Sequence, residues 1–462
     1  MKSRFNACIL GLLFPVLLQG QEIGLLRIDP ENMESSTKAA VWGGIEDGGF
    51  RPAYEAPFLW KAGAEAQLVR HENRMSWTGS ISFEQKTGKN MTSSLLLEPG
   101  YYPLDLLEFS KGTKSRQTCR VEGGFQTELG YEWAAGGRAS FKAAHAGKQQ
   151  DVHHSSIGME VQLEPALTYV MDDDMGFVSS YLVQLRTERL QATAGDPEAL
   201  FLDQGLRYGT YQALGGDGLF SIREFSHGFD EVFHCPELST GLGIHWKRGQ
   251  AGRNDNGYRF PGSTMHLFFG QTVLAERADH EYRVSYRRQR DQLRAVADGG
   301  RITALSDRTG RNMNLRYDVR FIDLFLKSVS VILDGNQWTE RALLPSTQDN
   351  IRWYDETATL LSSLSYGIID LDVNLQAGYG FWRNTGLADR PEGSLRLTDD
   401  WRRKMDYLMA PRMGMGGALT CRIPPVEGLF VQLYVYWLHA FNVSYLPGKN
   451  REIVTLKAGY NF

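Results

Sequence analysis

The chain is poor in cysteine, with four in 462 residues. Cys8 lies in an apolar run near the N-terminus, whereas Cys119, Cys235 and Cys421 are far apart and show no Cys-x-x-Cys spacing. Three distant cysteines make neither a disulfide framework nor a zinc site. We expect at least one thiol to remain unpaired, and all three to be small apolar side chains that are buried or face lipid.

A strong net charge and long apolar runs are also missing. The formal net charge is −4 and no long basic run occurs, which argues against a nucleic-acid partner. No apolar stretch approaches the ~18 residues of a transmembrane helix. The mean hydropathy of −0.35 resembles that of a soluble protein. It does not exclude a membrane barrel, because only alternate strand residues of a barrel face lipid.

The N-terminus has the order of a secretory signal. Lys2 and Arg4 precede the apolar run from Cys8 to Leu18, and small and polar residues come next. We expect residues 1–20 to be a signal peptide, residues 21–36 an irregular segment, and residues 37–462 a single domain.

Alternating strands are what the sequence has in abundance. At the C-terminus, Val454, Leu456, Ala458, Tyr460 and Phe462 alternate with polar residues and so form one apolar strand face. The same alternation recurs along the chain, over segments long enough for tilted membrane strands of about 9–11 residues. Soluble strands average about 5–6.

The pattern therefore predicts an all-β fold, a single antiparallel transmembrane β-barrel of about 16–18 strands with long outer loops and a short N-terminal segment. Short and long loops alternate consistently along the whole chain only if there are two extra membrane-crossing strands, one near 38–44 and one inside 190–236. We expect the second of these strands near 206–214. The number of strands is then 18, and without both it is 16. We expect long outer connections at 87–116, 190–236, 335–354 and 384–404.

Catalytic and metal-binding patterns are weak. His153 and His154, beside Asp151, fall in an expected outer loop over 145–155, and the Asp172–Asp174 run lacks the later positions of a calcium loop. A hydrolase would need a Ser, a His and an acid close together. The candidates are Ser226, one of His227 and His234, and one of Asp230 and Glu231, and no Gly-x-Ser-x-Gly motif is present. We expect no enzyme, no cofactor and no metal.

Charged residues of both signs lie on the strand faces that we expect to line the lumen. The candidates for lumen-lining residues are Arg138, Lys142, Arg316, Asp318, Arg320, Asp370, Asp372 and Lys457.

Short motifs, in order along nearly the whole chain, resemble a Bacteroidota-type outer-membrane β-barrel family of unknown function. They are Gly49–Pro52 with Ala62–Glu65, Glu98–Asp105 with Leu107–Phe109, Leu202–Leu206 with Tyr208–Gly209, and Arg259–Gly262. The resemblance implies the outer membrane of a Gram-negative bacterium, and the terminal Tyr460 and Phe462 resemble a recognition signal for the barrel-assembly machinery. It implies no catalytic residue. Pro99, Gly100 and Pro103 suggest a fixed loop that could turn inward as a plug or cap.

These observations favour passage or capture of a solute across the outer membrane, with membrane lipids and the assembly machinery as partners. The alternative is a non-conducting scaffold that holds surface lipoproteins or an envelope complex. A hydrolase is the least favoured interpretation.

Overall fold

A computed structural model describes residues 35–72, 74–148, 153–172, 175–193, 200–204, 209–211, 219–253, 256–297, 300–322, 324–344, 350–385, 395–424, 426 and 428–462. The predicted signal peptide, and all but two residues of the predicted irregular segment, lie outside the described residues. Among these residues, no helix has both the length and the apolar character needed to cross a membrane.

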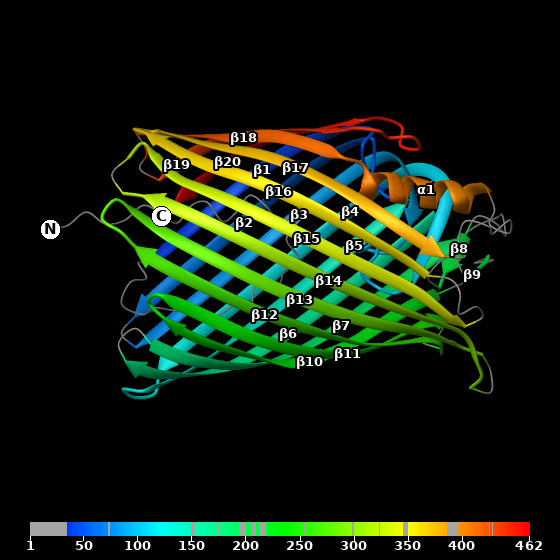
Figure 1. Ribbon diagram of the computed structural model, residues 1–462, viewed down its shortest axis with the longest axis horizontal. Coiled ribbons are helices and arrows are strands. Elements are labelled where there is room, and N and C mark those ends of the chain that lie inside the picture. Colours follow the sequence, from blue (N-terminus) through cyan, green and yellow to red (C-terminus); the bar gives the residue numbers. More distant parts are fainter. Residues whose placement is uncertain are drawn as a thin grey trace.

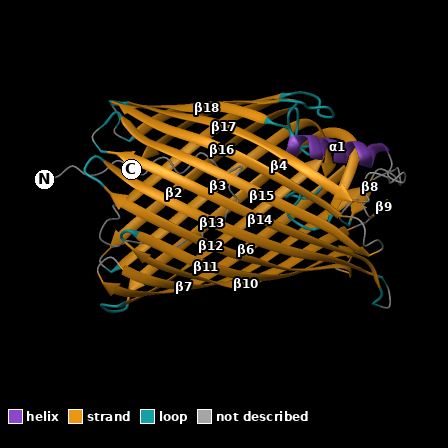
Figure 2. Ribbon diagram, in the orientation of Figure 1, coloured by secondary structure: helices purple, strands orange, loops and turns teal. Residues whose placement is uncertain are grey.

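The strands form one closed antiparallel barrel (Figures 1 and 2). Strands β1 to β7 succeed one another around the wall, β10 pairs with β7, and the order continues to β20. Strand β20 pairs with β1 from Lys38–Asn461 to Gly48–Arg451 and closes the barrel. The short strands β8 and β9 stand apart from the wall, so 18 of the 20 strands in the described part of the chain make up the barrel. The predicted fold is confirmed.

The strands and the helix have these bounds: β1 Ser36–Gly48, β2 Phe58–Glu72, β3 Met75–Ser94, β4 Asp105–Glu128, β5 Trp133–Lys148, β6 His153–Asp172, β7 Met175–Thr193, β8 Leu200–Asp203, β9 Gly209–Tyr211, β10 Leu219–Cys235, β11 Leu238–Arg253, β12 Asn256–Leu274, β13 Ala278–Val296, β14 Ile302–Phe321, β15 Leu326–Leu344, β16 Asn350–Tyr366, β17 Ile369–Thr385, α1 Leu395–Met409, β18 Arg412–Arg422, β19 Leu429–Ala440 and β20 Asn450–Asn461.

Residues of the wall alternate between an apolar outer face and a polar inner face. On β20, Leu456 is 55% exposed on the outer surface, whereas the next residue, Lys457, is 8% exposed and pairs with Glu65 of β2. Large apolar side chains stay exposed along many strands because they form the outer belt of the barrel. Among the described residues, every wall strand is paired on both sides, so none of these strands presents a backbone edge to lipid. Such a barrel belongs in the outer membrane of a Gram-negative bacterium, and membrane lipid is the environment of its outer surface.

The two ends of the barrel differ. The C-terminus and the start of β1 lie at one end (Figure 1), where tight turns such as 129–132, 275–277 and 367–368 join the strands. The long connections and α1 lie at the other end. Short turns mark the periplasmic side of outer-membrane barrels, so the end that carries α1 is the outer mouth.

The second extra crossing is in 190–236, but its predicted position near 206–214 is wrong. The crossing is β10, and within 206–214 the described residues form β9, which pairs with β8. The cause is visible on β10, where the inward residues Phe220, Ile222 and Val232 are apolar and buried. Apolar residues on the inner face interrupt the alternation that would have located the strand.

The predicted loops are too long, because the strands extend well past the membrane. Strands β3 and β4 reach Ser94 and Asp105, β5 and β6 leave only 149–152 between them, and β15 reaches Leu344. Within 384–404, the described part contains the start of α1, which strand alternation could not predict.

Candidate functional site

The outer end of the β3–β4 hairpin bends away from the wall. Two register shifts, at Gly88/Met91 and Met91/Ser93, interrupt the pairing of β3 with β4. Asn90 and Ser93 have positive φ angles of 57° and 68°. β-Bulges of this kind kink a strand and redirect the residues after the kink. We call residues 89–113 the mouth hairpin.

A buried ion cluster fixes the base of the mouth hairpin. Glu108 is fully buried and its carboxylate lies 2.5 Å from Lys114 Nζ and 2.7 Å from Lys148 Nζ of β5. Lys148 Nζ also donates hydrogen bonds to the carbonyl oxygen and Oγ of Ser110, both at 2.8 Å. A side chain on Gly112 would lie 2.2 Å from Lys148 Cε, so glycine makes room for the lysine. A buried charge that keeps all its partners is rigidly held.

The tip of the mouth hairpin reaches across the lumen. Glu98 forms ion pairs with Lys142 of β5 and with Arg186 of β7, the latter at 2.5 Å. The amide of Leu97 donates to Glu188 of β7 at 2.8 Å. From a different part of the wall, Arg308 of β14 donates to the carbonyl oxygen of Gly100 at 2.7 Å. The tip is therefore held between distant strands, as the proline and glycine residues of this segment suggested.

Tyr101 lies at the centre of these contacts. Its hydroxyl donates to Glu224 of β10 at 2.7 Å, and the Arg186 guanidinium carbon lies 3.8 Å from its ring centroid. Lys247 of β11 lies 2.8 Å from Asp291 of β13, and its ammonium is 5.2 Å from the same ring. A tyrosine between cations gains from cation–π attraction, which is stronger where water is excluded.

Apolar packing completes the mouth hairpin. Strand β8 pairs with the start of β4, from Asp105–Asp203 to Glu108–Leu200. Together they cover the inner faces of β7 and β10 to β13 at the outer end. This core consists of Leu95, Leu96, Tyr102, Leu104, Leu106, Leu190, Ala192, Leu200, Leu202, Phe220, Ile222, Ala251, Phe260 and Leu293.

Helix α1 fills a different sector of the mouth. Met405 and Met409 pack against Ile351 and Trp353 on the inner face of β16. A side chain on Gly380 of β17 would lie 2.7 Å from the Leu408 carbonyl oxygen, so glycine lets the helix backbone approach the wall. The β1–β2 connection joins α1 here through Phe50 and Tyr407, whose ring centroids are 5.1 Å apart.

The mouth hairpin holds its charges firmly. Burial by itself raises the pKa of Glu98, but the positive charges of Arg186 and Lys142 outweigh burial and lower the pKa to about 2. Burial raises the pKa of Tyr101, and the nearby Glu224 carboxylate adds to this effect. Glu98 is therefore anionic and Tyr101 a neutral hydroxyl at neutral pH.

The candidate lumen-lining residues lie at several places along the wall. Lys142 is the one that contacts the mouth hairpin. The others have local partners: Arg138 with Glu122 at 3.2 Å, Arg316 with Asp318 at 2.6 Å, Asp318 with Ser330, Arg320 with Glu281 at 3.4 Å, Asp370 with Arg422, Asp372 with Ser363 at 2.8 Å, and Lys457 with Glu65 at 2.5 Å.

The hydrolase candidates are not assembled. Ser226 and His227 are consecutive on β10 and therefore point to opposite faces. Ser226 Oγ donates to Glu224 at 3.4 Å, whereas His227 Nδ1 lies 3.1 Å from the Tyr181 hydroxyl. His234 is eight residues further along the strand, roughly 26 Å away at 3.3 Å per residue. Asp230 instead contacts His245 of β11 at 2.8 Å.

The metal candidates are likewise separated. His153 and His154 begin β6 rather than lying in a long loop, and they occupy opposite faces of it. Asp172 ends β6, and Met175 begins β7. Within the described ranges, no three His, Cys, Asp or Glu side chains group in a way that could hold a metal ion. Cys119, Cys235 and Cys421 are free thiols of intermediate exposure.

The central residues of the site were not predicted. The segment around Pro99 was expected to turn inward, but Glu98 and Tyr101 had no assigned partners. Arg186, Lys247 and Arg308 come from strands far from residue 98 in sequence. No single-sequence signal pairs such residues, because strand alternation gives the face of a residue and not its neighbour across the lumen.

Comparison with protein-family models gives no match, and neither does comparison with curated protein sequences. Among solved structures, the chain is similar to the FrpB iron transporter from Neisseria meningitidis, at 8% identity over 94% of this chain and 82% of that chain, with a TM-score of 0.47. It is also similar to the ferric yersiniabactin uptake receptor FyuA from Yersinia pestis, at 10% identity over 93% and 80%, with a TM-score of 0.44. A third similarity is to CdiB from Acinetobacter baumannii, at 8% identity over 93% and 60%, with a TM-score of 0.39. At these identities and scores, no ligand or activity transfers to this chain.

Proposed function

We propose that the barrel admits a polar solute through its lumen, and that the mouth hairpin forms the constriction that the solute must pass. The observation that carries this proposal is the crossing of the mouth by residues 98–101, which are tied to β5, β7, β10 and β14. A purely structural closure needs only apolar packing. Here charged groups of both signs converge on the tip in addition to the apolar packing, as they do in selectivity constrictions.

The proposal assigns the specificity to the tip. Glu98 and Glu224 are acceptors, and Arg186, Lys247 and Arg308 are donors, so a zwitterionic or polyhydroxylated solute could exchange hydrogen bonds with them as it passes. The candidate residues Arg138, Lys142, Arg316, Asp318, Arg320, Asp370, Asp372 and Lys457 would form the polar lining of the rest of the path.

Planar bilayers test this proposal. We expect low conductance from the native protein, and a clear increase after residues 96–103 are replaced by a flexible Gly-Ser linker. A matched replacement in the exposed turn 129–132, at the periplasmic end, should leave conductance unchanged. Failure of the linker variant to conduct, in a barrel that is shown to be folded, would refute passage through the lumen.

The filled mouth also favours a second candidate function, a non-conducting scaffold for surface lipoproteins or an envelope complex. The separating measurement is mild-detergent extraction from the native membrane. A stoichiometric surface protein that co-purifies with a non-conducting barrel would select the scaffold.

We further propose that the chain is a member of the Bacteroidota-type barrel family that its motifs resemble, and that its assembly depends on the barrel-assembly machinery. The support for the second point is the register of the last strand. Phe462 N donates to the Thr37 carbonyl oxygen at 2.8 Å, and the Tyr460 and Phe462 rings are 4.5 Å apart, beside the closing seam.

A further inference from the structure

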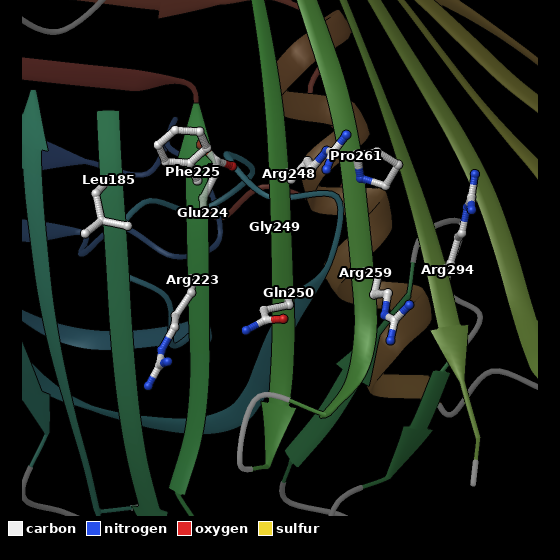
Figure 3. Close-up of a pocket in the computed structure, with 10 residues that line it drawn as sticks. All are labelled: Leu185, Arg223, Glu224, Phe225, Arg248, Gly249, Gln250, Arg259, Pro261 and Arg294. Atoms are coloured by element: carbon white, nitrogen blue, oxygen red, sulfur yellow. The ribbon is translucent and has the colours of Figure 1, made fainter. Parts of the chain in front are cut away.

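A group of arginines lies on the outer surface of the wall, near the mouth. Figure 3 shows Arg223 on β10, Arg248 on β11, Arg259 on β12 and Arg294 on β13 around an open cavity of about 550 Å³. All four side chains are exposed. We call these four residues the arginine patch.

The sheet register places three residues of the arginine patch, Arg223, Arg259 and Arg294, in one row on the outer face. Arg223 is opposite Gln250, Gln250 is opposite Arg259, and Arg259 is opposite Arg294. In Figure 3 the four residues of this row lie side by side on neighbouring strands. Arg248 belongs to the adjacent row, opposite Phe225.

That adjacent row marks the edge of the apolar belt. Phe225 is opposite Leu185 of β7, and these side chains are 45% and 50% exposed on the outer surface. Two residues along β10 lies Arg223, which is about 5 Å higher in a strand tilted by about 45°. Arg223 therefore stands at headgroup depth, directly above apolar side chains that contact acyl chains.

Two arginines of the patch, Arg259 and Arg294, hold like charges beside each other, and a bound anion would offset their repulsion. Arg259 and Arg294 face each other directly, an arrangement of like charges that is destabilising by itself. Arg294 donates to Gln292 Oε1 at 2.8 and 2.6 Å, and this neutral acceptor does not cancel its charge. A second like-charged pair, Arg288 opposite Arg311, lies on the same outer face.

We propose that the arginine patch binds the phosphate of a phosphorylated lipid in the outer leaflet, with its acyl chains against Leu185 and Phe225. Guanidinium groups bind phosphate oxygens in bidentate fashion, and a phosphate between Arg259 and Arg294 turns their repulsion into attraction to a shared anion. The apolar edge distinguishes a lipid from free phosphate, because only a lipid uses both halves of the site.

The test uses the purified full-length barrel in nanodiscs that contain bis-phosphorylated lipid A, dephosphorylated lipid A or neither. Native mass spectrometry counts bound lipid, and titration gives the affinity. For Arg259→Gln/Arg294→Gln we expect a loss of roughly tenfold or more for phosphorylated lipid A. The control Arg74→Gln/Arg277→Gln removes the same charge from exposed turns at the periplasmic end and should bind as the native protein does.

Three outcomes overturn the proposal. The first is equal binding of dephosphorylated lipid A. The second is complete displacement of lipid A by millimolar inorganic phosphate, which would make the arginine patch a free-phosphate site. The third is that the double variant binds phosphorylated lipid A as tightly as the native protein does. This outcome counts against the proposal even if the double variant no longer retains an acidic protein that is co-extracted with the native barrel. The melting temperature without lipid separates loss of binding from loss of folding. We expect the double variant to melt at the same temperature as the native barrel or higher, because the substitutions remove two like charges that face each other.

Discussion

Substitution of Glu98 by Gln should loosen the tip of the mouth hairpin without disturbing the wall. The amide keeps the size of the side chain and one acceptor oxygen, but it loses the charge that attracts Lys142 and Arg186. The side chain is 13% exposed, so solvent screens these pairs only partly.

The magnitude can be worked out from the pKa. Arg186 and Lys142 lower the pKa of Glu98 from 4.5 to about 2 against the effect of burial. A shift of this size corresponds to about 3 kcal/mol of interaction with the charged form. If opening of the tip breaks both pairs, its equilibrium constant should rise by about two orders of magnitude.

Hydrogen exchange measures this opening at named amides. Leu95 N donates to the Leu106 carbonyl oxygen at 2.9 Å, and Leu97 N donates to Glu188 at 2.8 Å, so both amides report on the mouth hairpin. We expect their protection to fall about 100-fold in Glu98→Gln, whereas amides of β14 stay protected.

The matched control is Glu84→Gln, which removes a half-exposed carboxylate of β3 that lies 2.9 Å from Lys86. It should change protection of the mouth hairpin little, since surface pairs contribute about 0–1 kcal/mol. Protection of Leu95 and Leu97 within about threefold of the native value in Glu98→Gln would refute the view that ion pairs hold the tip.

Three further predictions concern acid, barrel assembly and the helix in the mouth. Because the pKa of Glu98 is lowered, its contribution is complete above pH 4.5 and is lost as the pH falls through about 2, so conductance should rise in acid strong enough to protonate Glu98. Phe462→Ala, or deletion of the last three residues, should reduce the amount of barrel in the membrane and leave any conductance per barrel unchanged; normal membrane levels by quantitative blotting would contradict the proposed assembly signal. Gly380→Val should displace α1, because the new side chain meets the Leu408 carbonyl oxygen at 2.7 Å, and should raise protease sensitivity of 395–409 on intact cells; Gly335→Val, whose nearest contact is at 4.0 Å, is its control.

The sequence predicted the wall well because membrane strands obey one rule, alternation of faces. Val454 to Phe462 obey it, and so do the strands around Leu315 and Leu371. The rule weakened wherever the inner face turned apolar. Phe220 and Ile222 pack against the mouth hairpin, so the inner face of β10 turns apolar at its outer end, the alternation of the strand is interrupted, and its position was predicted wrongly. Helix α1 was not predicted, because strand alternation carries no information about a helix that packs inside the mouth.

The outer ends of β10 to β13 reverse the polarity of the rest of the barrel. Their inner faces carry Phe220, Ala251, Phe260 and Leu293, which are buried in the core of the mouth hairpin. Their outer faces carry the arginine patch. On β10 both changes begin just beyond Phe225, where the outer face leaves the hydrocarbon and the inner face meets the mouth hairpin. Outside the hydrocarbon, the outer face can carry charge at a cost of about 0–1 kcal/mol per residue, whereas the inner face gains by burying apolar side chains. The reversed polarity thus locates the membrane boundary on this side of the barrel. It also means that the proposed constriction and the proposed lipid site lie on opposite faces of the same strands. Substitutions in the arginine patch should alter lipid binding and leave the tip of the mouth hairpin unchanged, because the wall stands between them.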